Sequence, residues 1–436
     1  MLNCRPIPSG ARALRMSFGA LSLAGIIVHV AAAQGVASPA APEVRLGAPP
    51  SRLYGGIDYL LWSVKNVPLA VPLLSTGSGD PNSEEGFLRS PESTVLYGAP
   101  HPPAQGGKNS QPLPWLNGSR ATLGYWLDDT HDTALEASGF WLQQRSNGYQ
   151  FTTDPNGNPG GRIPLYNNTP YLAGGPGGIL VPPLEDGVPV GVPGAVSGSA
   201  SFKNTLQVWG ADTSGVVTLY RDPSWELSGL AGLRYLNLTE SFHLQLNIGG
   251  VPDTMYATEY GWASDSFKTE NQFFGGQLGF RGRYAYGRLS AELTTKIGIG
   301  LSHETEAIAG AFQEFNTPVL TSLPFMPAGQ RANFGGPNGI FAQPSNEGNR
   351  STNKFAVVPD VEVKLGYDLT ESMRLTIGYE FLYYSSVLRP TDQIDRSFSK
   401  GLPFLQDPTS TTGPMRKFHT TDFYAQGMNV GVAFRF

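Results

Sequence analysis

The sequence has almost no cysteine and no long apolar segment after its first 33 residues. Its single cysteine, Cys4, lies near the N-terminus, so the rest of the chain cannot be stabilised by disulfides. Charged residues make up only 15% of the chain, and no stretch beyond residue 33 is apolar enough for a membrane-spanning helix. The remaining alternatives are a soluble all-β protein or a chain that crosses a membrane with strands.

The N-terminal segment has the features of a secretory signal peptide. Arg5, Arg12 and Arg15 precede a mostly apolar run that ends in three alanines at residues 31–33. We expect cleavage after Ala33, a periplasmic lead over residues 34–51 and one domain over residues 52–436. Removing the three arginines leaves 27 basic against 35 acidic residues, a net charge of −8. This balance argues against nucleic acid as a partner.

The last fourteen residues, FYAQGMNVGVAFRF, alternate between apolar and small or polar side chains. Because successive side chains of a strand point to opposite sides, this segment has one apolar and one polar face. A strand of about 10 residues can cross a bilayer. A final strand that ends on an aromatic residue is typical of bacterial outer-membrane barrels. Phe434 and Phe436 are therefore the predicted signal for the barrel assembly machinery.

Alternation predicts ten strands in all, an even number that suits an antiparallel up-and-down barrel. The connections after the second, fourth, sixth and eighth strands are short, whereas the others are long and rich in Gly, Pro, Asn and Ser, such as residues 146–203 and 310–354. Short periplasmic turns and long extracellular loops give such a pattern. The predicted strands cover residues 53–62, 120–127, 133–144, 205–220, 225–238, 272–284, 288–301, 355–367, 373–384 and 423–436.

One face of most predicted strands is apolar and the other carries charges of both signs. In a barrel the apolar faces meet outer-membrane lipid and the charged faces meet the lumen. Aromatic residues near strand ends, including Trp62, Trp225, Tyr235, Tyr284 and Tyr384, are expected in the interfacial girdles. The predicted lumen-lining residues are Asp58, Arg120, Glu136, Glu226, Arg234, Arg281, Arg288, Glu292, Lys296, Asp360, Glu362, Lys364, Arg374, Glu380 and Arg435.

A series of distinctive phrases spans nearly the whole chain after the predicted signal peptide. They are GGIDYLLWSVKNVPLAVPLLSTG, STVLYG at 93–98, SRATLGYWLDDTHDTALEASGFWL, LAGLRYLNLTES at 230–241, NQFFGGQLGFRG at 271–282, VVPDVEVKLGYDLTESMRLTIGYEFLYYSSVLRPTDQID at 357–395 and the closing strand. Their order and spacing, which are more specific than any one phrase, resemble those of the beta barrel porin-7 family of bacterial outer-membrane proteins. The resemblance implies an outer-membrane β-barrel with a pore role.

Other motifs have simpler structural interpretations. Asp128, Asp129, His131 and Asp132 could hold a hard cation, but Asp residues also favour tight turns, which is the interpretation that we adopt. The Gly-rich stretch at 174–178 does not match a phosphate-binding loop and is expected to be loop. We therefore expect no metal and no cofactor.

An enzymatic barrel is a further alternative, because some outer-membrane barrels carry catalytic Ser, His and Asp groups on one rim. The histidines beyond the signal peptide fall mostly in predicted loops or near strand ends, and none lies in a recognisable nucleophile motif. We expect no enzyme. These histidines are His101, His131, His243, His303 and His419.

The sequence leaves two functions open. An open lumen with a mixed charged lining would pass small hydrophilic solutes by diffusion, and this is the function that we expect. The same charges could instead pair across the lumen and fill it, as side chains do in the smallest barrels. The protein would then be a non-conducting structural or adhesive protein that acts through its long loops.

Overall fold

The computed structural model describes residues 52–77, 86–168, 171–173, 179–181, 184–254, 257–318, 331–398 and 413–435. The predicted signal peptide, the predicted lead segment and Phe436 lie outside these residues. No helix in the described part of the chain is both long enough and apolar enough to span a membrane.

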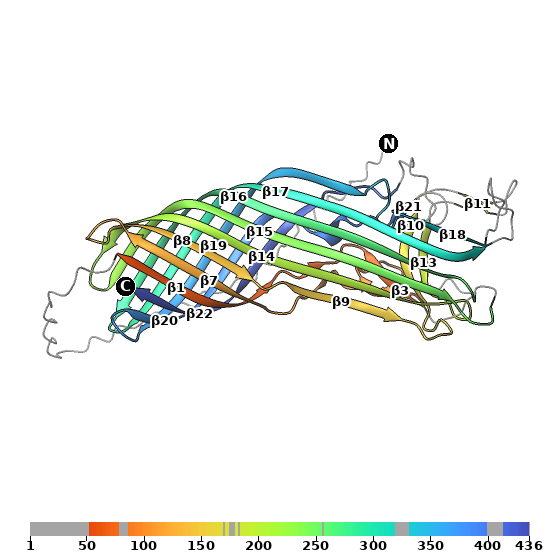
Figure 1. Cartoon of the computed structure of the whole chain (residues 1–436), viewed down its shortest axis with the longest axis horizontal. Helices are drawn as coiled ribbons and strands as arrows, with labels where there is room; N and C mark the ends of the chain where they lie inside the picture. The colour runs from red at the N-terminus through yellow and green to blue at the C-terminus, as the bar shows by residue number, and fades with distance from the viewer. Residues whose placement is uncertain are drawn as a thin grey trace, which may run out of the picture. The chain divides into compact units, whose positions relative to one another are not determined.

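Ten antiparallel strands form a closed ring, as the sequence predicts (Figure 1). Each strand pairs with its predecessor, and the last strand pairs with the first over Tyr54↔Arg435 to Val64↔Ala425. Backbone groups of the ring strands therefore bond to neighbouring strands, as an apolar membrane requires. The ring strands are β1 (Leu53–Val64), β7 (Leu116–Trp126), β8 (Thr133–Leu142), β14 (Val196–Arg221), β15 (Trp225–Gly250), β16 (Tyr260–Tyr286), β17 (Leu289–Pro318), β19 (Gly348–Asp368), β20 (Met373–Leu388) and β22 (Thr420–Arg435).

Four short turns join the strands at one end of the barrel, and the long connections lie at the other, as predicted. The turn after β7 is fixed by Asp128, whose carboxylate accepts hydrogen bonds from the backbone N–H of Asp132 (2.8 Å) and of Thr133 (2.7 Å). These bonds, with that from Asp132 the strongest, lower the pKa of Asp128 to about 2. The local bonding supports the turn interpretation of this acidic cluster.

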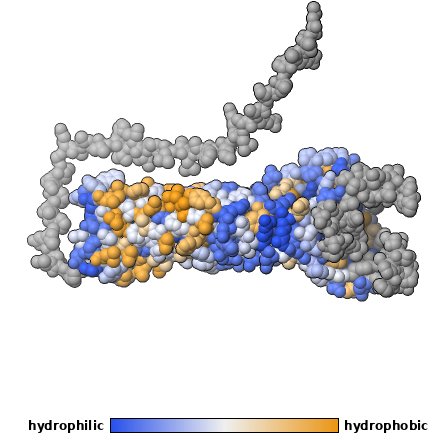
Figure 2. Space-filling model, turned by 90° about the horizontal axis from the view of Figure 1, so that it is seen from above, coloured by the Kyte–Doolittle hydropathy of each residue, from blue (hydrophilic) through white to orange (hydrophobic). Residues whose placement is uncertain are grey.

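The strands β14 to β17 are much longer than predicted, at 26 to 30 residues each. A membrane needs only about 10 residues of each strand. Figure 2 shows apolar side chains over the part of the surface nearest the short turns, and hydrophilic side chains beyond it. We call these two parts the membrane half and the extracellular half, because outer-membrane barrels direct their short turns to the periplasm.

The polarity of both strand faces inverts between the two halves. On β16 the outward side chains are apolar from Phe274 to Tyr284, but polar at Ser264, Ser266 and Lys268. The inward side chains change from Arg281 in the membrane half to buried groups of both kinds in the extracellular half, such as Phe267 and Asp265. The same strand therefore faces lipid outside a polar interior, and then water outside a buried interior of mixed apolar and polar side chains.

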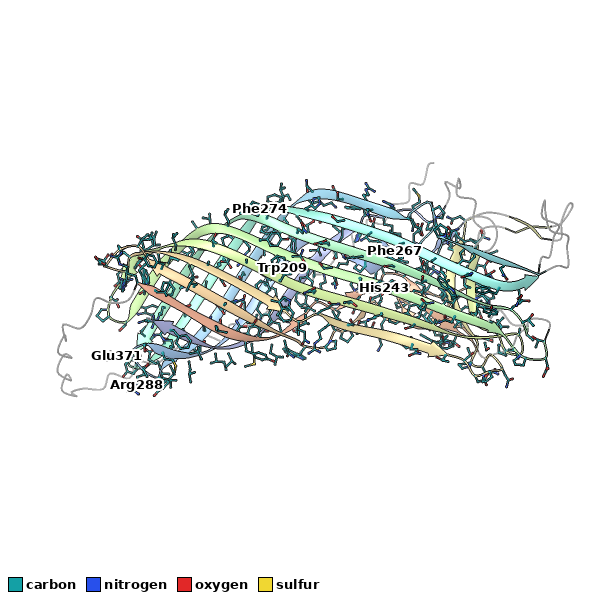
Figure 3. All side chains as sticks on the ribbon, viewed as in Figure 1. Trp209, His243, Phe267, Phe274, Arg288 and Glu371 are labelled. Carbon is teal, nitrogen blue, oxygen red and sulfur yellow. The ribbon has the colours of Figure 1, made fainter. Side chains whose placement is uncertain are left out.

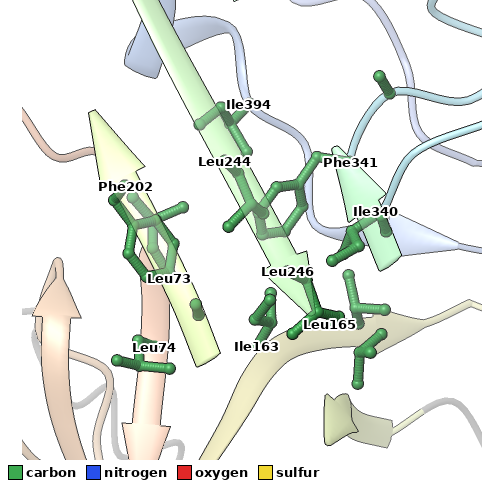
Figure 4. Close-up of a cluster of buried hydrophobic side chains, with 14 of the residues drawn as sticks. Leu73, Leu74, Ile163, Leu165, Phe202, Leu244, Leu246, Ile340, Phe341 and Ile394 are labelled. Carbon is green, nitrogen blue, oxygen red and sulfur yellow. The ribbon is translucent and has the colours of Figure 1, made fainter. Parts of the chain in front are cut away.

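The predicted long connections contain a second sheet, so their interpretation as loop was partly wrong. The predicted connection at residues 146–203 contains a strand, β13, that pairs with β10. This sheet is ordered by apolar side chains that pack onto the inward faces of β14 to β17, including Leu73, Ile163, Phe202 and Leu244 (Figure 4). Its strands are β3 (Pro72–Thr76), β4 (Thr94–Gly98), β5 (Gln105–Gly106), β10 (Gly161–Asn167), β13 (Leu184–Gly191) and β21 (Ser397–Phe398).

Short elements complete the extracellular half. Strand β9 continues along β14 beyond the end of β8, and β18 pairs with the end of β17. The remaining elements are β2 (Val67–Pro68), β6 (Ser110–Gln111), β9 (Arg145–Thr152), β11 (Tyr171–Ala173), β12 (Ile179–Val181), β18 (Arg331–Gly336) and the 3-10 helix η1 (Pro390–Gln393).

Candidate functional site

The interior of the membrane half encloses a cavity of about 830 Å³. The structure places fourteen of the fifteen predicted lumen residues around it. The exception is Arg288, which is exposed in the turn between β16 and β17 and lines a separate pocket beside Asp368. Figure 3 shows Arg288 and Glu371 at the short-turn end of the barrel. Arg288 was assigned to the lumen because the predicted strand began one residue before β17 does.

A network of ion pairs and hydrogen bonds centred on Arg120 crosses this cavity on the side away from the short turns. Its guanidinium lies 2.6 Å from Glu380 and 3.2 Å from Glu362, so that it bridges from β7 to β20 and β19. The amide of Asn429 donates to both carboxylates, at 2.8 Å to Glu362 and 2.9 Å to Glu380. Trp62 donates its indole N–H to the Asn429 oxygen at 2.8 Å. Together these bonds connect five strands across the interior, and those to the two carboxylates are charge-assisted.

Further pairs hold four more of the lumen cations. Arg281 binds Glu136 through two hydrogen bonds of 2.8 and 2.9 Å, a bidentate geometry that orients both groups. Each of the other three cations also has a carboxylate within 4.0 Å. These pairs are Arg234 with Asp360 (2.6 Å), Lys296 with Asp212 (2.9 Å), and Lys364 with Glu362 (3.2 Å) and Asp58 (3.4 Å).

Sequence analysis missed Asp212, which faces the lumen from β14 and accepts a hydrogen bond from Gln277 at 2.9 Å. Its strand alternates poorly in sequence because the polarity of its faces inverts part of the way along. A signal was present nonetheless. Asp212 is the only charged residue between Lys203 and Arg221, within a run that is otherwise apolar, small or uncharged.

Farther from the short turns than the charged network, the lumen holds a belt of buried, mostly apolar side chains, which we call the apolar belt. Members of the belt come from nine of the ten ring strands, and each is at most 8% exposed. Side chains that expose so little surface do not line a water-filled channel at this height. The belt comprises Leu60, Trp62, Val64, Leu116, Leu142, Leu206, Val208, Leu236, Leu238, Phe273, Ala356, Val358, Leu382, Tyr384, Val387, Phe423 and Ala425.

Two belt residues, Trp62 and Tyr384, had been predicted in the interfacial girdles, and that prediction was wrong. Both are completely buried inside the barrel. Trp62 lies four residues after the inward Asp58, and Tyr384 four after the inward Glu380, so the period of a strand puts each on the lumen face. Trp225 and Tyr284 do lie outside, 55% and 38% exposed, with their rings 4.8 Å apart.

Beyond the belt, a buried ion pair fixes the segment between β20 and the 3-10 helix η1 to the barrel wall. Arg389 is completely buried and binds Glu240 of β15 through two hydrogen bonds of 2.6 and 2.7 Å. A third bond runs from Arg389 to the carbonyl of Asn66 at 3.0 Å. Because each partner satisfies the other, this pair can exist in a dry interior.

A second buried anchor holds the segment at residues 339–346. The carboxylate of Asp265, on β16, accepts hydrogen bonds from the backbone N–H of Ile340, Phe341 and Ala342 at 2.9 to 3.2 Å. Burial in the apolar interior nonetheless raises the pKa of Asp265 to about 7, with these bonds acting against the increase.

Within the described residues, no three His, Cys, Asp or Glu side chains gather in a manner that could hold a metal ion. Among the histidines, the ring of His303 contacts Asn353 at 2.7 Å and that of His101 contacts Glu185 at 3.2 Å. None of these described histidines hydrogen-bonds a serine hydroxyl.

The family model described as "Putative beta barrel porin-7" matches residues 54–436. Among solved structures, the outer membrane protease OmpT from Escherichia coli is 9% identical over 89% of this chain and 97% of its own, with a TM-score of 0.38. The toluene transporter TodX from P. putida is 8% identical over 89% of this chain and 90% of its own, with a TM-score of 0.17. No curated protein matches the sequence. The family match covers most of the chain, which is therefore an outer-membrane β-barrel and belongs to the beta barrel porin-7 family.

Proposed function

We propose that this barrel is closed to solutes in the conformation described here and that it acts through its extracellular half, in a structural or adhesive role. The apolar belt is the observation that carries this proposal. A diffusion pore needs a continuous polar path, whereas the belt interrupts that path with side chains from nearly every ring strand.

The charges below the belt support the same function. Each of the five cations within the network is paired with a carboxylate. Paired charges satisfy one another and connect the strands, so they stabilise a filled interior as well as they would line a pore. The ordered second sheet gives the extracellular half a fixed surface to present.

Passive diffusion of small hydrophilic solutes, the function expected from the sequence, is the second candidate. The charged cavity of about 830 Å³ in the membrane half favours it, because that cavity is large enough to hold water and a small solute. Conduction would require the belt to rearrange. In either case we propose that the protein works without covalent catalysis, a cofactor or a bound metal.

A liposome-swelling assay with a small sugar tests the proposal. Intact protein is expected to give no swelling, and so is Phe274→Ala, which alters a lipid-facing ring. Phe273→Ala combined with Trp62→Ala removes two belt rings and is expected to admit the sugar. Rapid swelling with intact, folded protein would favour diffusion as the function instead.

A further inference from the structure

Three arginines converge at the short-turn end of the lumen, which we call the periplasmic mouth. Arg283 lies on β16, Arg374 on β20 and Arg435 on β22, and all three line the interior cavity. Strand β16 is not adjacent to β20 or β22 in the ring, so these side chains approach one another across the opening. Arg283 is close enough to both of the others for their charges to repel it.

The nearby carboxylates are largely engaged with other cations. Asp368 binds Arg374 through bonds of 2.5 and 3.1 Å. The two others have partners as well: Glu226 lies 3.2 Å from Arg221, and Glu292 lies 3.7 Å from Arg281. Glu371 of the β19–β20 turn also lines the cavity.

In the described part of the chain, no carboxylate comes within 4.0 Å of Arg283 or Arg435. Glu226 and Glu292 attract both guanidiniums only from a greater distance. The Nε of Arg283 is buried and has no hydrogen-bond partner. An unpaired buried donor carries a desolvation cost, which an incoming acceptor would remove. Repulsion among the three like charges would fall as well.

We propose that the periplasmic mouth binds a small soluble oxyanion, of the phosphate or polycarboxylate class, that enters from the periplasm. Guanidinium groups bind such oxygens through paired, charge-assisted hydrogen bonds. The site lies inside the barrel, so the wall separates it from the acyl chains of the bilayer. This inference is independent of the proposed function, because a closed barrel and a conducting one would both present the same mouth.

Titration of inorganic phosphate into the mature protein tests the inference, with the protein refolded in zwitterionic detergent at constant ionic strength. Binding is measured by calorimetry. Arg283→Gln and Arg435→Gln are each expected to weaken the affinity about tenfold or more, since each removes charge-assisted bonds. Lys268→Gln, on the outward face of the extracellular half, changes the charge equally and is expected to leave the affinity unchanged.

A second measurement avoids variants that fail to fold. Arginine-selective labelling of the intact protein, read by mass spectrometry, should decrease at Arg283 and Arg435 when phosphate is present. Unchanged labelling, or equal affinity in all three variants, would overturn the proposal. Displacement of phosphate by micelles that contain phosphatidylglycerol would overturn the assignment of a soluble ligand.

Discussion

The membrane half and the extracellular half of the barrel use the same strands with opposite polarity. In the membrane half Phe274 and Leu278 face lipid while Arg281 faces a polar cavity; in the extracellular half Lys268 faces water while Phe267 is buried. Successive side chains point to opposite faces along the whole of β16, so the inversion of polarity requires no change in the backbone. The solvent on each side determines which face must be apolar. The belt lies where the interior changes from polar to apolar.

The two halves are expected to differ most in the stability lost when one partner of an ion pair is removed. Arg389→Met leaves Glu240 unpaired in a dry interior and should lower the free energy of unfolding by about 3–5 kcal/mol. Arg281→Met leaves Glu136 beside the cavity, where water can solvate it, and should cost less. Denaturant unfolding of both variants measures this. The double variant Arg389→Met with Glu240→Leu should recover most of the loss, and an equal cost for the two single variants would contradict the distinction.

Adjacent phenylalanines on β16 provide a comparison across the wall. Phe273 is completely buried in the belt, and Phe274 is 61% exposed toward lipid. Phe273→Ala should destabilise the protein by about 3–5 kcal/mol, because it leaves a cavity in a packed interior. Phe274→Ala should cost less, since acyl chains can fill the space. Unfolding in the same detergent tests both, and the reverse order would mean that the belt is loosely packed.

A charge placed on one face at two heights tests the polarity inversion itself. Leu278→Arg would bring a guanidinium to the lipid-facing surface and should destabilise by about 2–4 kcal/mol, depending on its depth. Ser264→Arg lies on the same outward face of β16 in the extracellular half, where the change should be within about 0.5 kcal/mol. Similar costs at the two sites would place the membrane boundary elsewhere.

A pH dependence of stability is expected in the extracellular half. The folded-state pKa of Asp265, about 7, lies above its ordinary value of 3.8. The folded state therefore binds more protons between these values, and stability should fall as pH rises from about 4 to 7, by at most about 1.4 kcal/mol per pH unit. Hydrogen exchange at residues 340–342 measures this. Asp265→Asn should flatten the pH profile, and an unchanged profile would exclude Asp265 as its source.

The strand number, the short turns and the face assignments could be predicted because each depends on alternation within one segment. Strand lengths could not, since the apolar residues move from one face to the other at the inversion, and this interrupts the alternation in the sequence. The same inversion concealed Asp212 and put Trp62 in the girdle. The belt depends on residues from nine strands meeting at one height, which requires the register between strands. The second sheet was missed because its strands are short and rich in Gly and Pro.

Single-channel recording of the intact, refolded protein in a planar bilayer tests the closure by the belt most directly. The account predicts no discrete current steps from the intact protein or from Phe274→Ala, and reproducible steps once Phe273 and Trp62 are both replaced by alanine. Reproducible steps from the intact protein, with folding verified by heat-modifiable migration in SDS, would contradict it.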